Sequence, residues 1–186
     1  MNASALLADR RQTTDPNNRG EERSSLGRVG LSYEINDAWS FENRLGYQDR
    51  DITADMASMF YLAETNYETF SYSPALHYNS NAVDWMFGLD FTKDKLDANT
   101  NYGDSAYERF SSAFFTSTGL QLTDQWNLNG NFRIERAENS GVDSGTQLNE
   151  VNKDEWAGGI GLIRQFGEKN RVYGTIRRFY RYAATD

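Results

Sequence analysis

The feature that most constrains this chain is a strict alternation of apolar and polar side chains. From Val83 to Phe91 every second residue is apolar, and the residues between them are polar or small, apart from Met86. Successive side chains of a β-strand point to opposite faces, so the stretch predicts a strand with one apolar face. The polar Asn79-Ser80-Asn81 before it favours a tight turn, because Asn and Ser bond their own backbone there. Together with the preceding Leu76 to Tyr78, the stretch predicts a β-hairpin.

Similar turn signals recur at a fixed spacing. They fall at Asn36-Asp37, Ser80-Asn81, Asp124 and Gly167-Glu168, and steps of 44 residues from position 36 reach 80, 124 and 168. Apolar or aromatic residues flank each turn. Longer polar connections are expected between consecutive turns, at residues 51–59, 95–106 and 138–153. The repeat predicts an antiparallel meander in which short and long connections alternate.

Nine strands are expected, the first of them the end of a longer strand. In the strand over residues 60–78 the apolar phase changes near Glu68-Thr69, which predicts a β-bulge, and Pro74 argues against full pairing. The strands are expected at residues 3–11, 23–34, 39–48, 60–78, 83–92, 107–122, 126–135, 155–166 and 171–181.

Composition bounds the environment of the apolar face. Only 38% of the 186 residues are hydrophobic, and no stretch is apolar over the ~20 residues that a membrane-crossing helix needs. Barrel strands show lipid only every second residue, and the aromatic residues gather near the turns, as at a bilayer interface. We therefore expect an all-β, up-and-down antiparallel meander of about eight or nine strands. It would form part of a transmembrane outer-membrane β-barrel and would not close on its own.

Two sets of residues follow from this assignment. The polar strand face is expected to line a water-filled lumen, and the apolar face with its aromatic residues to meet lipid. The lumen-lining candidates are Glu42, Arg44, Asn127, Asn129, Asn131 and Arg133. The lipid-facing or interfacial aromatic residues are Tyr33, Trp39, Phe41, Tyr78, Trp85, Phe87, Phe91 and Trp126.

The chain offers little for catalysis. Cysteine is absent, which excludes disulfides and thiolate sites, and the net charge of −8 disfavours nucleic acid as a partner. His77 and Ser80 suggest a comparison with outer-membrane phospholipases, but His77 lies beside a short turn, far from the outer leaflet. Carboxylates such as Glu42 and Glu135 lack an accompanying nucleophile. We expect no enzyme, no metal site and no cofactor.

The C-terminal residues carry a family resemblance. Val172 to Asp186 contains Tyr173-Gly174 and a segment with Arg178, Arg181 and Asp186. This resembles a strand end of TonB-dependent outer-membrane receptors, which reads tyrosine-glycine followed by Arg-x-Phe-Arg-x-Pro before an acidic position. Tyr180 stands where Phe is usual, and Ala183 stands where Pro is expected.

The resemblance implies an importer of scarce solutes, of the ferric siderophore or cobalamin class, in the outer membrane of a Gram-negative cell. Such barrels have about twenty-two strands around an N-terminal plug. Residues 1–186 would be a single internal barrel segment without a plug, and the absence of a signal peptide agrees with a piece of a longer protein. The implied partners are membrane lipid, the remaining strands and plug, TonB through that plug, and a small-molecule solute.

Two alternatives stay open. One is a complete small eight-stranded barrel with a structural or adhesive role, and the other is a fragment of a passive porin. The ending Ala183-Ala184-Thr185-Asp186 lacks the terminal aromatic residue of complete barrels, which weighs against the first. We expect the isolated chain to leave two strand edges unpaired and not to form a heat-resistant barrel.

Overall fold

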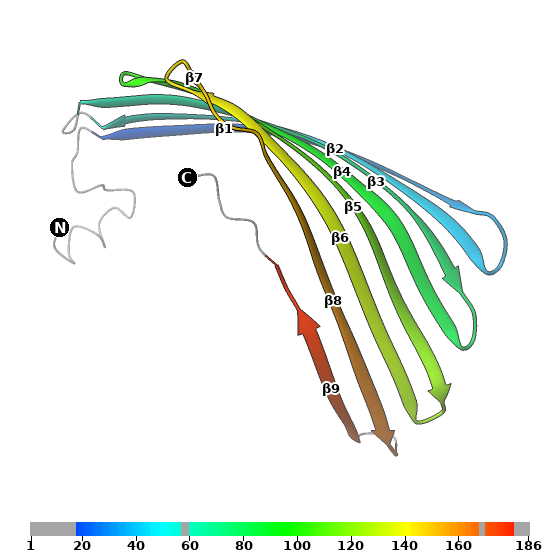
Figure 1. Ribbon diagram of the computed structural model, residues 1–186. Helices are drawn as coiled ribbons and strands as arrows, with labels where there is room; N and C mark the ends of the chain where they lie inside the picture. Colours follow the sequence, from blue (N-terminus) through cyan, green and yellow to red (C-terminus); the bar gives the residue numbers. More distant parts are fainter. Residues whose placement is uncertain (1–17, 57–59, 168–169, 181–186) are drawn as a thin grey trace, which may run out of the picture.

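The computed structural model describes residues 18–56, 60–167 and 170–180, and every regular element in these ranges is a β-strand. The strands lie side by side in one curved sheet (Figure 1). Their bounds are Arg19–Glu34 (β1), Trp39–Met56 (β2), Tyr61–Asn79 (β3), Val83–Thr100 (β4), Gly103–Thr123 (β5), Trp126–Asp143 (β6), Thr146–Gln147 (β7), Val151–Phe166 (β8) and Asn170–Arg178 (β9).

The sheet is an antiparallel meander, as predicted. Its order is β1-β2-β3-β4-β5-β6-β8-β9, and the two-residue β7 pairs only with the end of β6. Strands β1 and β9 each pair with one neighbour, so the sheet is open within the described residues. The strand predicted at residues 3–11 lies outside the described ranges.

The four predicted reversals lie at the same edge of the sheet, because every strand between them is antiparallel to the next. Local hydrogen bonds close these turns. The Asn36 side-chain oxygen accepts the backbone N–H groups of Ala38 and Trp39, both at 3.0 Å. The Ser80 hydroxyl accepts the N–H of Val83 at 3.1 Å. Gly167 has a φ of 66°, which glycine adopts without strain, while Glu168 lies outside the described residues.

The predicted long connections are wrong in extent. Strand β2 continues to Met56, β6 continues to Asp143, and β4 and β5 are joined through Asn101 and Tyr102 alone. The backbone ladder runs on through this region, where one face becomes charged and the apolar or small residues, such as Ile52, Ala63 and Leu96, lie on the other face. The apolar phase is thus inverted among many charged residues, and these strand ends resemble loops in the sequence. We call this half of the sheet the rim.

The predicted bulge near Glu68-Thr69 is also wrong. The pairing of β2 with β3 is unbroken from Trp39↔Tyr78 to Met56↔Tyr61. The phase change arises because the apolar residues before it occupy the opposite sheet face. Pro74 does interrupt the ladder, as expected of a residue without an N–H group: the β3–β4 pairs stop at Tyr72 and resume at Ala75.

Strand register assigns each side chain to one of two faces. One row of paired residues runs Tyr33, Phe41, Leu76, Phe87, Thr116 and Phe132 from β1 to β6. The adjacent row on the other face runs Glu42, Ala75, Gly88, Phe115 and Arg133 from β2 to β6. We call these the belt face and the polar face.

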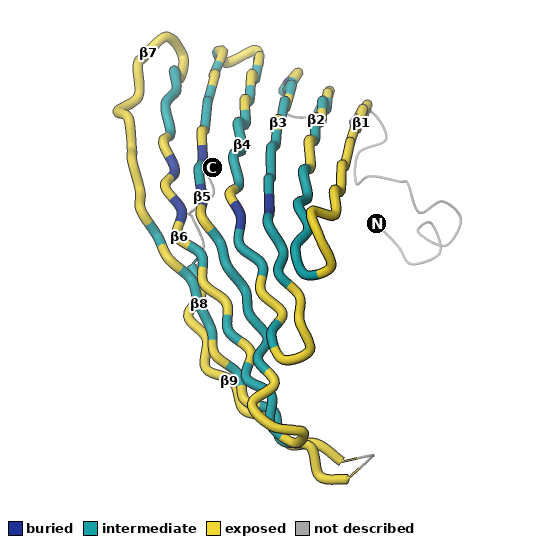
Figure 2. Tube along the Cα trace, turned by 90° about the vertical axis from the view of Figure 1, so that its right-hand side faces the viewer, coloured by how far each residue is buried: buried dark blue, intermediate teal, exposed yellow. Residues whose placement is uncertain are grey.

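The buried residues lie along β3 to β6 (Figure 2), and by register they share the polar face. They are small, apart from one carboxylate, as expected where long side chains crowd one face of a sheet. They are Ala63, Ala75, Gly88, Ser111, Ala113, Glu135 and Ala137.

The pair of Gly88 and Phe115 explains why Phe115 of β5 lies out of phase with the neighbouring Phe114. Gly88 and Phe115 pair directly on the polar face, and the Phe115 ring lies over the glycine. A Cβ at position 88 would lie 2.6 Å from the Phe115 ring and 2.6 Å from the Pro74 carbonyl oxygen. Only a residue without a side chain fits there.

Gly88→Ala should therefore lower the free energy of unfolding of the parent barrel by about 1–3 kcal/mol through overpacking. Gly30→Ala is the matched control, because the nearest atom to its added Cβ is 3.9 Å away. Urea unfolding in lipid vesicles, followed by tryptophan fluorescence, measures both. Equal stabilities of the two variants would contradict this packing.

Candidate functional site

An apolar belt covers the half of the belt face next to the short turns. On four strands it occupies alternate positions over nine residues, namely Trp39–Tyr47, Phe70–Tyr78, Val83–Phe91 and Trp126–Ile134, with Asn43 as its polar exception. Eight steps of about 3.3 Å span about 27 Å, and a strand tilt of about 40° reduces this to a height of about 20 Å. The apolar band of a transmembrane barrel is about 25 Å tall.

The belt ends abruptly on its rim side. The next belt-face positions after Tyr47, Phe70, Phe91 and Ile134 are Asp49, Glu68, Lys93 and Arg136. Within the belt, large side chains are exposed, including Trp85 at 45%, Leu89 at 42% and Ile134 at 48%. A contiguous exposed apolar surface of this kind marks contact with another apolar phase.

All eight aromatic residues predicted to meet lipid lie on the belt face by register. Near the turns their rings contact one another: the Trp39 centroid lies 4.8 Å from that of Tyr78 and 6.5 Å from that of Phe87. The Trp85 indole N–H donates to the Thr116 hydroxyl at 2.7 Å. The indole N–H thus has a hydrogen-bond partner within the sheet, and it needs no water molecule as an acceptor.

All six predicted lumen residues share the polar face. Arg44 donates to both oxygens of Glu42, at 2.8 and 2.9 Å, and the Nε2 atom of His77 lies 3.4 Å from the same carboxylate. The Ser80 hydroxyl instead bonds Val83 within its turn. His77 and Ser80 therefore do not form a nucleophile and base pair.

The Arg133 cluster is the densest polar group on this face. It consists of Asp90, Arg109, Arg133, Glu135 and Tyr180. Arg133 bonds Asp90 and donates to Glu135 Oε2 at 2.9 Å. The Tyr180 hydroxyl donates to the same Glu135 oxygen at 2.6 Å, and Arg109 Nη2 lies 3.5 Å from Glu135 Oε1. The charges neutralise one another where Glu135 is only 8% exposed.

Small residues make this cluster possible. Ala113 on β5 lies between Asp90 and Glu135 in the same paired row. Arg133 on β6 therefore reaches Asp90 on β4 across β5, over the methyl group of Ala113. Ser111 and Ala137 pair in the next row, under the path from Arg109 to Glu135. Of the five residues of the cluster, only Arg133 is among the lumen-lining candidates predicted from the sequence. The cluster was missed because it depends on three strands in register, and alternating Ala and Ser opposite long charged residues was the available signal.

A shallow groove lies beside this cluster on the polar face. Gly159 and Gly161 on β8 lack side chains and leave a groove of about 380 Å³. Asn129 and Asn131, two of the predicted lumen residues, form one bank. Tyr173, Thr175 and Arg177 of β9 form the other.

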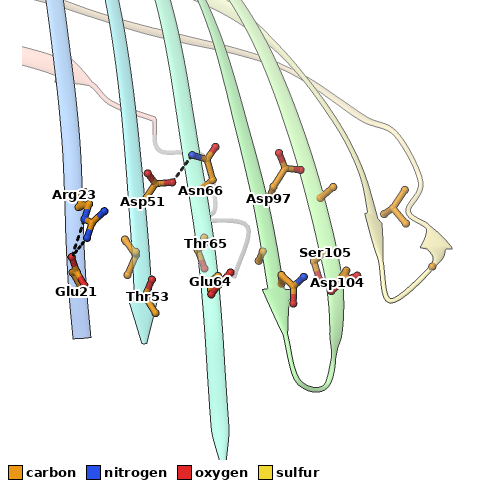
Figure 3. A pocket seen from close by; sticks show the side chains of 16 residues that line it. Glu21, Arg23, Asp51, Thr53, Glu64, Thr65, Asn66, Asp97, Asp104 and Ser105 are labelled. Atoms are coloured by element: carbon orange, nitrogen blue, oxygen red, sulfur yellow. Dashed lines mark hydrogen bonds and ion pairs between the residues drawn. The ribbon is translucent and has the colours of Figure 1, made fainter. Parts of the chain in front are cut away.

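A larger concavity, of about 880 Å³, lies elsewhere, across the rim (Figure 3). One row of its lining residues, Glu21, Thr53, Glu64, Asn99 and Asp104, is formed by successive strands on the belt face, beyond the belt. The Asn66 amide donates to Asp51 at 2.8 Å. The charged side chains that line this hollow, such as Arg23 and Glu21, are exposed and form no enclosed site. We attribute the hollow to the twist of the long strands. Among the described residues no group of three acidic or histidine side chains could hold a metal ion.

The family-motif residues are only partly described. Arg178 ends β9 on the belt face, with its guanidinium 4.0 Å from the Trp156 ring centroid and 3.7 Å from the Glu155 carboxylate. Arg181 and Asp186 lie outside the described residues. No helix in the described ranges is long and apolar enough to cross a membrane.

Solved structures share this fold. The alcaligin outer-membrane receptor FauA from Bordetella pertussis matches with a TM-score of 0.76 and 12% identity, over 85% of this chain and 29% of that chain. The ferric-catecholate import receptor Fiu from Escherichia coli K12 matches at 0.72 and 11%, over 85% and 33%. The translocator domain of autotransporter NalP from Neisseria meningitidis matches at 0.56 and 12%, over 84% and 59%.

The chain thus spans about a third of the length of the receptors that it matches. No protein-family model and no curated protein matches the sequence. The fold is that of a segment of an outer-membrane β-barrel, and the resemblance to TonB-dependent receptors indicated by the sequence is confirmed at the level of the fold alone. The predicted outer-membrane location agrees with this fold.

Arg133→Gln should destabilise the parent barrel, because the Asp90 and Glu135 carboxylates would then face each other on a crowded surface. Adding Asp90→Asn should recover part of the loss, with a coupling energy of about 1–2 kcal/mol in a double-mutant cycle. The exposed Arg23–Glu21 pair of the rim is the control, and Arg23→Gln should change stability by less than about 0.5 kcal/mol. A coupling energy near zero would refute the role of the cluster.

Proposed function

We propose that this chain forms part of the barrel wall of a TonB-dependent outer-membrane receptor that imports a scarce solute of the ferric siderophore or cobalamin class. The observation that carries the proposal is the belt: its height fits the hydrocarbon layer of an outer membrane, and the opposite face carries charged and amide side chains such as Arg133 and Asn129 among small residues. The matched structures include an alcaligin receptor and a ferric-catecholate receptor, which favours an iron-chelate solute.

The position of the belt along the strands orients the wall. The strands end close to the belt at the short-turn edge and continue far beyond it at the rim edge. Outer-membrane barrels have short turns on the periplasmic side and their longer parts outside the cell. We therefore assign the short turns to the periplasm and the rim to the cell exterior.

The proposed partners follow from the outer edges of β1 and β9, which have no neighbouring strand in the described residues, and from the polar face. The free edges of β1 and β9 would pair with the remaining strands of the parent barrel, since unpaired backbone groups in hydrocarbon cost several kcal/mol each. The polar face would look into the lumen, where the groove and the Arg133 cluster would contact the plug or the solute. TonB would act through the plug. In this role the chain is a transport element and not an enzyme.

The assignment of faces is tested by placing the same charge on each. Phe87→Arg lies in the belt and should abolish membrane assembly of the parent protein, because a midplane Arg costs about 2–4 kcal/mol in lipid. Asn129→Arg is the matched control on the polar face and should assemble normally. The heat-dependent gel shift of outer-membrane extracts measures assembly. Similar behaviour of the two variants would reject the assignment.

The transport role is tested in the producing bacterium. Deletion of the parent gene should abolish growth on one iron chelate or cobalamin as the limiting source, and should leave growth on the others unchanged. Deletion of tonB should abolish growth on that source as well, because import by such a receptor is energised from the inner membrane. Uptake that survives without TonB would favour the passive porin instead.

A further inference from the structure

Arg164 is a cation on the apolar belt face. It pairs in register with Trp126 on β6 and with Val172 on β9, whose side chains share that face. The next row toward the middle of the belt is the pair Leu128 and Leu162. Arg164 therefore occupies the outermost row of the belt on the short-turn side, where hydrocarbon gives way to lipid headgroups.

The surroundings of Arg164 hold its guanidinium in place. Its carbon lies 4.4 Å from the Phe166 ring centroid and 5.1 Å from that of Trp126. The Nε atom is buried without a hydrogen-bond partner. Aromatic rings stabilise the cation through their faces but accept none of its in-plane hydrogen bonds.

Arg164 also differs from the other arginines near the belt. Arg136 lies just beyond the opposite edge of the belt and bonds Glu138 at 3.1 Å. Arg178 lies 3.7 Å from Glu155. For Arg164 no ion pair with a carboxylate is found in the described part of the chain. Arg164 thus lies at the edge of the belt, beside two aromatic rings, with no carboxylate to neutralise its charge in the described part of the chain.

We propose that Arg164, Trp126 and Phe166 form a binding site for the phosphate of an anionic phospholipid in the periplasmic leaflet. The inference rests on the proposed function, because it requires the belt to lie in a membrane. The planar guanidinium offers a fork of donors that fits two phosphate oxygens, and the rings fix the plane of that fork. The acyl chains of the same lipid would lie along Leu162 and Ile160, which follow on the belt face.

The experiment uses the full-length parent protein in nanodiscs that contain phosphatidylcholine with a minor fraction of phosphatidylglycerol. Native mass spectrometry counts the lipids that remain bound, and the heat-dependent gel shift reports folding of each sample. The variants are Arg164→Gln, Arg164→Lys and the control Arg136→Gln. Arg164→Gln should bind phosphatidylglycerol about fivefold more weakly, the effect of one basic side chain at a membrane surface. The affinity of Arg164→Lys for phosphatidylglycerol should lie between those of Arg164→Gln and the wild type. The affinity of Arg136→Gln should match that of the wild type.

Three results would overturn the site. They are wild-type retention of phosphatidylglycerol by Arg164→Gln, equal loss in Arg164→Gln and Arg136→Gln, and displacement of the lipid by inorganic phosphate. If Arg164→Gln does not fold, the comparison of Arg164→Lys with the wild type decides, and equal binding by these two rejects the role of the fork. Failure of the wild type itself to insert would reject the proposed function and the lipid site together. Normal insertion of all variants without a difference in binding would reject the lipid site alone.

Discussion

The structure depends on the pairing of backbone hydrogen-bond groups. Hydrocarbon offers no partner to an N–H or C=O group, so a strand that crosses it must be paired along its whole length. The ladder between β2 and β3 meets this demand without a break from Trp39↔Tyr78 to Met56↔Tyr61. Strand lengths of 16 to 21 residues in β1 to β6 and β8 follow from it, as does the need of β1 and β9 for further strands.

Once the backbone is paired, the two faces obey different packing rules. In the proposed barrel wall the belt face needs bulk and apolarity but little fit, because lipid fills any irregular outline. The polar face is crowded, so it alternates long charged residues with Ala, Gly and Ser. Arg133 above Ala113, and Phe115 above Gly88, are two examples of one arrangement. On this face a long side chain on one strand is thus accommodated by a small residue on a neighbouring strand.

The sequence predicted what depends on local alternation and missed what depends on register. The turns at Asn36, Ser80 and Asp124, the meander, and the division of Trp85, Phe87, Asn129 and Arg133 between two faces all follow from a period of two. The rim strands were not predicted this way, because their apolar residues, such as Ile52 and Leu96, fall on the face opposite to the belt and stand among charged residues such as Asp97. The contact of Arg133 with Asp90 spans three strands, and no spacing along one strand contains it.

The length of the strands relative to the belt has an evolutionary consequence. About half of each long strand is rim, where most side chains meet water and contacts such as the Asn66–Asp51 hydrogen bond add to the backbone ladder. Substitutions there carry no penalty for insertion into lipid and, away from buried residues such as Ala63 and Ala137, disturb no crowded site. We expect the rim to vary rapidly among related proteins, as surfaces exposed to antibodies and phages do. The belt and the small residues of the polar face should change slowly. One continuous ladder thus joins two parts under opposite selection.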